Sequence, residues 1–243
     1  MAKNIFIAGK KLPEVSSFAD GFVLGENNVI VADPDDSKQE IPSGIKTVSW
    51  NRGSGVSARS AVIQSEAIMG FADDFILYFD SAYFASELKD FSIENCSECC
   101  DILISSYQFL ALEILNRIKQ RRSKSRVIFI LKSQPDIKDV VLSPNLRNTA
   151  SEPSNPFVAA GEAAFATFAE NFAVLSGEEE NLSVLLISGD NQNEVMMKDS
   201  SLASWLLDYI KASDELKNKP SVKNSVNWVK AGAKAPGGFS LFK

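Results

Sequence analysis

Residues 155–190 read NPFVAAGEAAFATFAENFAVLSGEEENLSVLLISGD, and this stretch decides the expected fold. Its first part is rich in alanine and phenylalanine and predicts a helix over Phe157–Leu175. A polar turn follows, and the apolar run Leu182–Ile187 then predicts a strand that ends in Ser-Gly. A long helix that leads directly into an apolar strand is typical of proteins that alternate helices with parallel strands.

The rest of the chain repeats this alternation. Further strands are expected at Asn4–Ala8, Val29–Ala32, Thr47–Trp50, Phe75–Phe79 and Arg126–Leu131. Further helices are expected near Pro13–Leu24, Val56–Gly70, Ser92–Arg122 and Ser200–Ala212. The strand segments IFIA, VIVA, FILYF, VIFIL and VLLI are continuously apolar, as parallel strands buried on both faces are. We therefore expect a Rossmann-like α/β fold, a doubly wound parallel sheet with helices on both faces. No repeat or composition shift divides the chain, which predicts a single domain over residues 1–243.

Composition excludes several classes of function. The chain has 243 residues, 45% of them hydrophobic, and a formal net charge of -6. An acidic protein of this kind lacks the cationic face that general nucleic-acid binding requires. No uninterrupted apolar run reaches membrane-spanning length, and the N-terminus enters a predicted strand within three residues. We expect a cytoplasmic protein without a membrane or nucleic-acid partner.

The chain contains no histidine, which removes imidazole bases, Ser-His-Asp triads and the commonest zinc ligand. Cys96, Cys99 and Cys100 are spaced i, i+3, i+4 and would share one helix face, which favours packing in a core or at an interface. A structural zinc site needs four ligands, and these thiols have no second pair to join. We expect no metal site.

The segment 155–190 resembles the active-site helix and the following strand of the short-chain dehydrogenase/reductase family. That family carries Tyr-x-x-x-Lys on this helix: the tyrosine is the general acid/base, and the lysine lowers its pKa and holds the nicotinamide ribose. The matching positions here are Phe157 and Gly161, which supply neither a phenol nor a charge. The predicted fifth strand ends in Lys132 and Ser133, where the family's catalytic serine belongs, so Ser133 is expected to be vestigial. The resemblance implies that the fold is kept and the reaction lost.

The resemblance also places a dinucleotide loop after the first strand, where this chain reads NIFIAGKKLPEV. Of the family's glycines only Gly9 remains, and Pro13 and Val15 stand at the later glycine positions. Lys10 and Lys11 could hold a phosphate as point charges instead.

Two acidic residues bear on the same question. Asp33 ends the second predicted strand, where an acid can bind an adenosine ribose 2′-hydroxyl. The alternative is a turn without a ligand, because the sequence Asp33-Pro34 strongly favours a turn. Pro13 and Glu14 fit the first turn of an ordinary helix, and Glu14 would repel a pyrophosphate. We expect no cofactor, with NAD(P) as the alternative.

The carboxyl ends of the central strands are where open α/β sheets bind ligands, and Asp80, Lys132, Ser133 and Phe157 are expected to gather there. Lys132 is the candidate base, but no partner for it is evident in the sequence, and lysines at strand ends are usually solvated. We predict a non-catalytic protein that acts as a binding or assembly module. The alternative is an NAD(P)-dependent oxidoreductase that uses Lys132 or Ser133.

The two longest predicted helices are Ser92–Arg122 and Phe157–Leu175, and the second carries Ala and Phe around more of its circumference than a single sheet-facing stripe needs. In the resembled family these helices commonly pair with their copies. We expect a homo-oligomer, a dimer or a tetramer, with another protein as a further candidate partner. The proline-rich segment 133–157 is expected to be a binding element or to close the vacated site.

Overall fold

The computed structural model describes residues 2–33, 42–89, 92–134, 155–216 and 226–235. Its strands are β1 (Asn4–Ala8), β2 (Asn28–Asp33), β3 (Ile45–Ser49), β4 (Asp74–Asp80), β5 (Ser125–Ser133), β6 (Leu182–Asp190) and β7 (Val229–Lys230). They form one seven-stranded sheet in the order β3-β2-β1-β4-β5-β6-β7, and every neighbouring pair is parallel.

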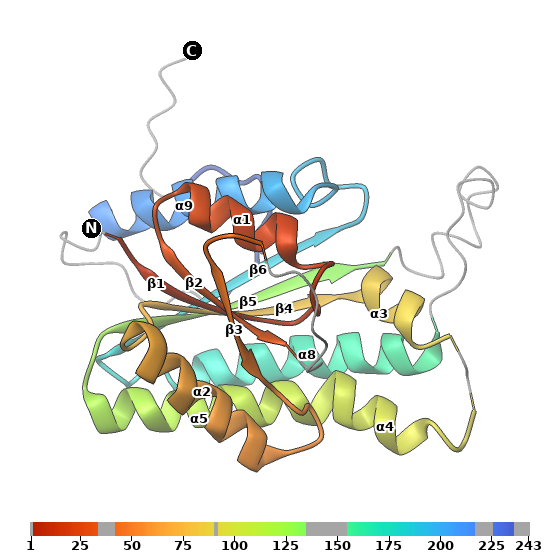
Figure 1. The fold of residues 1–243 in the computed structure, drawn as a ribbon. Helices are drawn as coiled ribbons and strands as arrows, with labels where there is room; N and C mark the ends of the chain where they lie inside the picture. The colour runs from red at the N-terminus through yellow and green to blue at the C-terminus, as the bar shows by residue number, and fades with distance from the viewer. Residues whose placement is uncertain (1, 34–41, 90–91, 135–154, 217–225, 236–243) are drawn as a thin grey trace.

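Helices cover both faces of this sheet (Figure 1). On one face lie α1 (Ser16–Leu24) and α9 (Asp199–Leu216); on the other lie α2 (Gly55–Met69), α5 (Ser106–Arg121) and α8 (Pro156–Leu175). A short helix, α3 (Ser81–Glu87), follows β4, and α4 (Cys96–Cys100) with the π-helical turn η1 (Asp101–Ser105) leads into α5. The doubly wound parallel fold expected from the sequence is confirmed.

Alternate side chains of the buried strands enter the two apolar layers. In β4, Phe75, Leu77 and Phe79 face the layer under α2, α5 and α8, while Ile76 and Tyr78 face the layer under α1 and α9. Every residue of β4 is buried, which explains why this strand reads as a continuous apolar run. Side chains beyond its carboxyl end therefore divide between the two faces of the sheet as well.

The first helix starts later than predicted. Pro13 and Glu14 precede α1, which begins at Ser16, because the Val15 N–H bonds the Lys11 carbonyl and the Ser16 N–H bonds the Pro13 carbonyl in a turn. Two short elements were not predicted: α3, which has about two helical turns, and the two-residue strand β7, and neither repeats its period often enough to be recognised.

The helix predicted at Ser92–Arg122 begins at Cys96 and is interrupted by η1. Core packing holds for one of the three cysteines: Cys99 is buried, whereas Cys96 and Cys100 are exposed, and packing of these two at an interface stays a prediction. Cys99 of α4 and Leu103 of η1 face the core, whereas the two flanking thiols do not.

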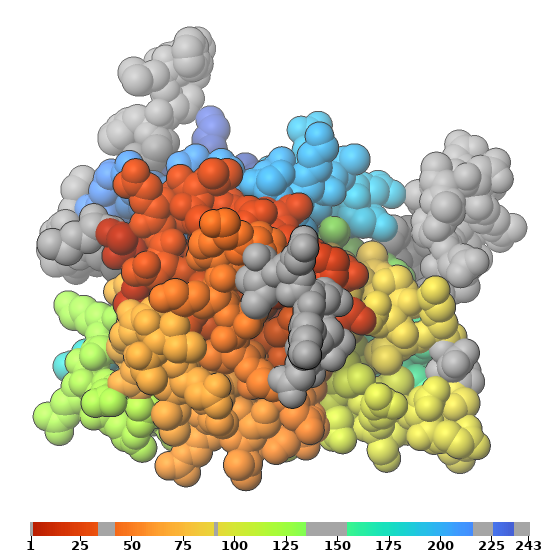
Figure 2. All heavy atoms as spheres, in the orientation of Figure 1, coloured from red at the N-terminus to blue at the C-terminus, as the bar shows by residue number. Residues whose placement is uncertain are grey.

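Among the described residues, α8 is the one helix long and apolar enough to cross a membrane by length and composition. It packs on the sheet through Val158, Phe165, Ala169 and Phe172, as a core helix does. In the space-filling view the orange segment that includes α2 lies toward the viewer, and little of α8 is visible (Figure 2).

Candidate functional site

The carboxyl ends of β1 and β4 meet at the switch point of the sheet, because β2 and β3 lie on one side of β1 and β5 to β7 lie beyond β4. Gly9 follows β1 here. A Cβ atom on Gly9 would lie 2.1 Å from the Tyr78 carbonyl oxygen, so the chain passes too close to β4 for any side chain. Close packing against β4 therefore explains why a glycine stands at position 9.

A buried arginine closes the same point from the other side. The Arg52 guanidinium donates hydrogen bonds to the Gly9 carbonyl and, at 3.4 Å, to the Ile102 carbonyl. Its Cζ lies 4.6 Å from the ring centroid of Trp50, 5.3 Å from Phe84 and 5.8 Å from Tyr107. Only 6% of Arg52 is exposed. Within the described ranges no carboxylate forms an ion pair with it.

Local sequence chemistry places Arg52 in this position. β3 ends at Ser49, and the Asn51 side chain accepts the Gly53 N–H at 3.0 Å, which closes a tight Asx turn. Ser54 then caps α2 by accepting the Ser57 N–H. The turn is thus fixed at both ends.

Amides of the loop between β1 and α1 are hydrogen-bonded to other groups of the protein. The Lys11 N–H donates to the Tyr83 hydroxyl at 3.3 Å, and the amides of Val15 and Ser16 bond carbonyls of the same loop. Burial raises the pKa of that Tyr83 phenol to about 12. The Lys11 ammonium pairs with Glu87 of α3.

A buried ionic network lies on the α1/α9 side of the strand ends. The Asp80 carboxylate lies 3.3 Å from both the Lys10 and the Lys132 ammonium groups, and Lys10 also pairs with Asp199 of α9. Tyr78 donates its hydroxyl to Asp199 at 3.2 Å, and burial holds the pKa of this phenol well above its usual value. The expectation of a solvated Lys132 without a partner is wrong, because the parallel register sets it opposite Asp80.

Asp80 has a second role, since its other oxygen accepts the amides of Ala82 and Tyr83 and caps α3. Of the three lysines named as candidate phosphate ligands or base, Lys10 and Lys132 both pair with this carboxylate, and Lys11 pairs with Glu87. The predicted proximity of Asp80 and Lys132 is confirmed, since their charged groups lie 3.3 Å apart, and the two form an ion pair.

On the α8 side the strand ends meet a different set of residues. Gly161 packs against η1, and a Cβ atom there would lie 2.7 Å from the Leu103 Cβ. The next residue, Glu162, accepts a hydrogen bond from the Ser81 hydroxyl at 2.5 Å, and burial raises the pKa of its carboxyl. Glu162 thus links α8 to the first residue of α3, directly after β4.

The two other positions taken from the resemblance lie nearby. The Ser133 hydroxyl donates to the Gly189 carbonyl at 3.4 Å. Phe157 is partly buried against the apolar layer, and its amide bonds the Asn155 side chain that caps α8. Ser133 and Lys132 are consecutive strand residues, so their side chains leave opposite faces of the sheet. The segment 135–154, including most of the proline-rich stretch, lies outside the described residues.

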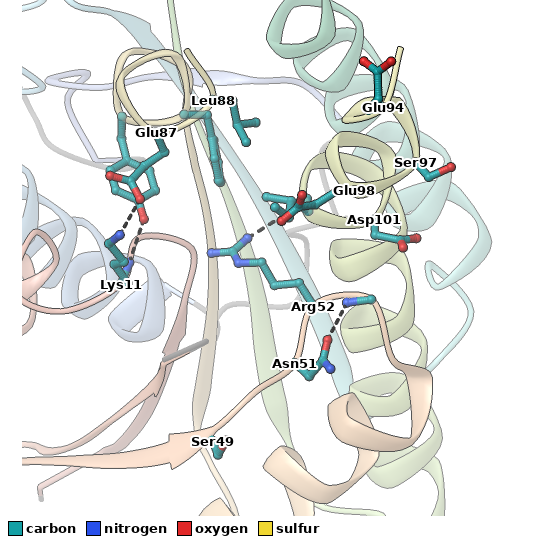
Figure 3. A pocket seen from close by; sticks show the side chains of 14 residues that line it. Lys11, Ser49, Asn51, Arg52, Glu87, Leu88, Glu94, Ser97, Glu98 and Asp101 are labelled. Atoms are coloured by element: carbon teal, nitrogen blue, oxygen red, sulfur yellow. Dashed lines mark hydrogen bonds and ion pairs between the residues drawn. The ribbon is translucent and has the colours of Figure 1, made fainter. Parts of the chain in front are cut away.

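A cleft of about 910 Å³ opens beside Arg52, between the β3–α2 turn, α3 and the α4/η1 helices (Figure 3). Its size suits a small molecule. Besides Arg52 its charged lining residues are Lys11, Glu87, Glu94, Glu98 and Asp101. Asp33, the predicted ribose ligand, is buried at the end of β2 and is not among the lining residues. The turn predicted after it, at residues 34–36, falls in the undescribed part of the chain.

The sequence analysis missed Arg52, Glu162 and Asp199. The turn NRGSG after a predicted strand and before a predicted helix was a local signal for Arg52. Nothing local marks Glu162 or Asp199, because each meets its partner across more than 80 residues of chain: Ser81 for Glu162, and Lys10 for Asp199.

No family model and no curated protein matches this chain. Solved structures do match. A short chain dehydrogenase from Mycobacterium smegmatis superposes with a TM-score of 0.65 at 11% identity, over 96% of this chain and 93% of that one. A short chain dehydrogenase/reductase family oxidoreductase from Aeromonas hydrophila gives 0.63 at 10% identity, over 93% and 98%. LigO in its apo form from Sphingobium sp. strain SYK-6 gives 0.57 at 12% identity, over 86% and 79%. The chain therefore has the Rossmann-like fold of the short-chain dehydrogenases/reductases.

Proposed function

We propose that this protein is a non-catalytic binding or assembly module on a short-chain-dehydrogenase fold. The observation that carries the proposal is the hydrogen bond at the switch point from the Arg52 guanidinium to the Gly9 carbonyl. A dinucleotide needs free amides and a close backbone approach at this point. In this chain the amides of Lys11, Val15 and Ser16 are already bonded, and the Gly9 carbonyl accepts the Arg52 guanidinium.

The charges of the loop support the same proposal. Lys10 is 5% exposed and pairs with Asp80 and Asp199, so binding a phosphate would require breaking two buried ion pairs. Removing one partner from a buried ion pair typically costs about 3–5 kcal/mol, because the remaining charge is left without compensation. Glu14, exposed in the turn before α1, adds repulsion of an approaching pyrophosphate.

The residues at the strand ends also support loss of hydride chemistry. Phe157 offers no proton, and Lys132, the substitute base of the oxidoreductase alternative, is paired with Asp80. General acid–base assistance typically contributes about 10²–10⁴-fold to a rate, so its absence leaves little turnover.

Titration with NAD, NADH, NADP and NADPH in a thermal-shift assay tests the proposal. A cofactor present at 100 times its Kd would add about 2.7 kcal/mol of stability. For a chain of this length that is a rise in Tm of about 5–11 °C. We expect no rise with any of the four.

The Phe157→Tyr variant is the matched control, because it restores the phenol of the family motif without changing the loop. We expect it to bind no cofactor and to oxidise no NAD(P)H with ketone or aldehyde substrates. A saturable rise in Tm, or NAD(P)H oxidation by either protein, contradicts the proposal.

We further propose that two copies associate through the outer surface of α5 and α8, which is the assembly part of the function. Phe109 and Leu112 of α5 are 38% and 49% exposed, and Ala159, Ala160 and Ala163 of α8 are exposed small residues that permit close approach. Burying a second helix face in a symmetric dimer is the commonest arrangement for soluble oligomers.

Light scattering at micromolar concentration is expected to give about twice the chain mass of 26.5 kDa. Leu112→Glu should shift the protein toward the monomer, whereas Leu24→Glu, on the opposite face of the sheet and 84% exposed, should not. A monomer for the unmodified chain, or equal effects of the two variants, would refute the dimer.

A further inference from the structure

The Arg52 guanidinium is a buried cation whose hydrogen-bonding capacity is only partly used. A guanidinium carries five N–H donors, and the Gly9 and Ile102 carbonyls accept one bond each. The rings of Trp50, Phe84 and Tyr107 supply cation–π attraction but no charge. Since burying a charge is costly unless it is paired, this site favours an added anionic group.

The wall of the cleft opposite Arg52 is acidic. Glu94, Glu98 and Asp101 stand on α4 and the segments joined to it, and none of them forms an ion pair with another described residue. Figure 3 shows Arg52 reaching across the cleft between Glu87 on one side and Glu98 on the other. The positive and negative side chains thus line the same cleft.

The two walls lie close enough for one small molecule to contact both. Arg52 donates to the carbonyl of Ile102, the residue after Asp101. A Cβ atom on Gly53 would lie 3.3 Å from the Asp101 carboxylate. Glu98 stands one turn before Ile102 on the same continuous helical stretch. A ligand a few atoms long therefore reaches from the guanidinium to these carboxylates.

We propose that the cleft binds a small zwitterion of the amino-acid type, with its carboxylate on Arg52 and its ammonium group on Glu98 and Asp101. This rests on the proposed function, since it requires that no dinucleotide occupies the switch point. Arginine and carboxylate form paired, charge-assisted hydrogen bonds of defined geometry. A dianion would meet four lining carboxylates, and a simple cation would leave Arg52 uncompensated.

Four five-carbon probes of equal length test the charge pattern: 5-aminopentanoate, glutarate, cadaverine and 1,5-pentanediol. Binding is followed by saturation-transfer NMR and by thermal shift, with each probe raised through the millimolar range. We expect 5-aminopentanoate to bind most tightly, and its Kd to rise at least about tenfold in Arg52→Gln, since a hydrogen bond to a charged group is lost.

A second variant guards against unfolding of Arg52→Gln. The Glu98→Gln, Asp101→Asn double variant changes side chains outside the apolar core and should weaken 5-aminopentanoate while leaving Tm of the free protein unchanged. Arg59→Gln, which removes a largely exposed arginine of α2, is the control and should bind as the unmodified protein does.

Strongest binding of glutarate, strongest binding of cadaverine, equal binding of all four probes, or no binding would each overturn the inference. So would a double variant that binds 5-aminopentanoate unchanged. These outcomes are separate from the cofactor titration: absence of zwitterion binding leaves the absence of NAD(P) binding untouched, whereas a bound dinucleotide defeats the proposed function itself.

Discussion

Gly161 stands at the position of the family's catalytic lysine, and we predict that it is required there by helix packing. A Cβ atom at this position would lie 2.7 Å from the Leu103 Cβ of η1, and 3.3 Å and 3.4 Å from two further atoms of the same side chain. A separation below 3.0 Å means that α8 and η1 must move apart. The perturbation that tests this is Gly161→Ala.

Two opposing free energies decide the outcome. Replacing glycine by alanine inside a helix is favourable by about 1 kcal/mol from propensity alone. Overpacking a closely packed contact typically costs about 1–3 kcal/mol. We therefore expect Gly161→Ala to be neutral or to lower the free energy of unfolding by up to about 2 kcal/mol. Lysine, the residue of the family motif, should be worse than alanine because it adds a longer side chain at the same contact.

Urea denaturation followed by circular dichroism measures the effect, with the midpoint interpreted only where the m-value is unchanged. Ala163→Gly, at an exposed position of α8, calibrates the propensity and should cost about 1 kcal/mol. In a Leu103→Ala background the cost of Gly161→Ala should shrink, since part of the opposing side chain is gone. If Gly161→Ala stabilises the protein by the full propensity value, the packing explanation is refuted.

Three further predictions concern a buried carboxyl group, a closely packed glycine and a buried phenol. Burial raises the pKa of the Glu162 carboxyl, so the folded state binds the proton more tightly and stability falls as pH rises from the ordinary value of 4.5 toward the folded pKa. Urea titrations should show Glu162→Gln gaining stability relative to the parent at pH 8 and losing that advantage near pH 4; a constant difference would contradict this. Gly9→Ala should lower Tm by several degrees, because its Cβ would overlap the Tyr78 carbonyl, and an unchanged Tm would contradict the close approach. Tyr107→Phe removes the 2.8 Å hydrogen bond to that same carbonyl and should cost about 1–3 kcal/mol in urea denaturation; a change below about 0.5 kcal/mol would show the bond to be unimportant.

The sequence alone determined the layers of the fold. Continuous apolar runs such as FILYF and VIFIL mark strands buried on both faces, and their alternation with helical segments restricts the sheet to parallel pairing. Where the pattern was short, as in α3 and β7, or where a turn imitated a helix start, as at Pro13, the prediction failed. A period is recognised only when it repeats, and α3 spans about two helical turns while β7 has only two residues.

The site was only partly accessible from sequence. Gly9, Lys10, Asp80 and Lys132 could be assigned to the strand ends, because the carboxyl ends of parallel strands meet at one edge. Their partners could not be assigned. The sequence aligns position 161 with a catalytic residue, but only the packing of α8 on η1 turns that position toward Leu103 and the next one, Glu162, toward Ser81.

Tertiary structure alone decided which charges are engaged. Lys132 is paired because the register of β4 and β5 sets it opposite Asp80, and Lys10 because α9 brings Asp199 over the same edge. Arg52 enters the interior because an Asx turn and a helix cap fix the loop that carries it. The sequence shows which charged groups are present. Which of them pair depends on the distances between residues far apart in the chain, and only the folded structure sets these distances.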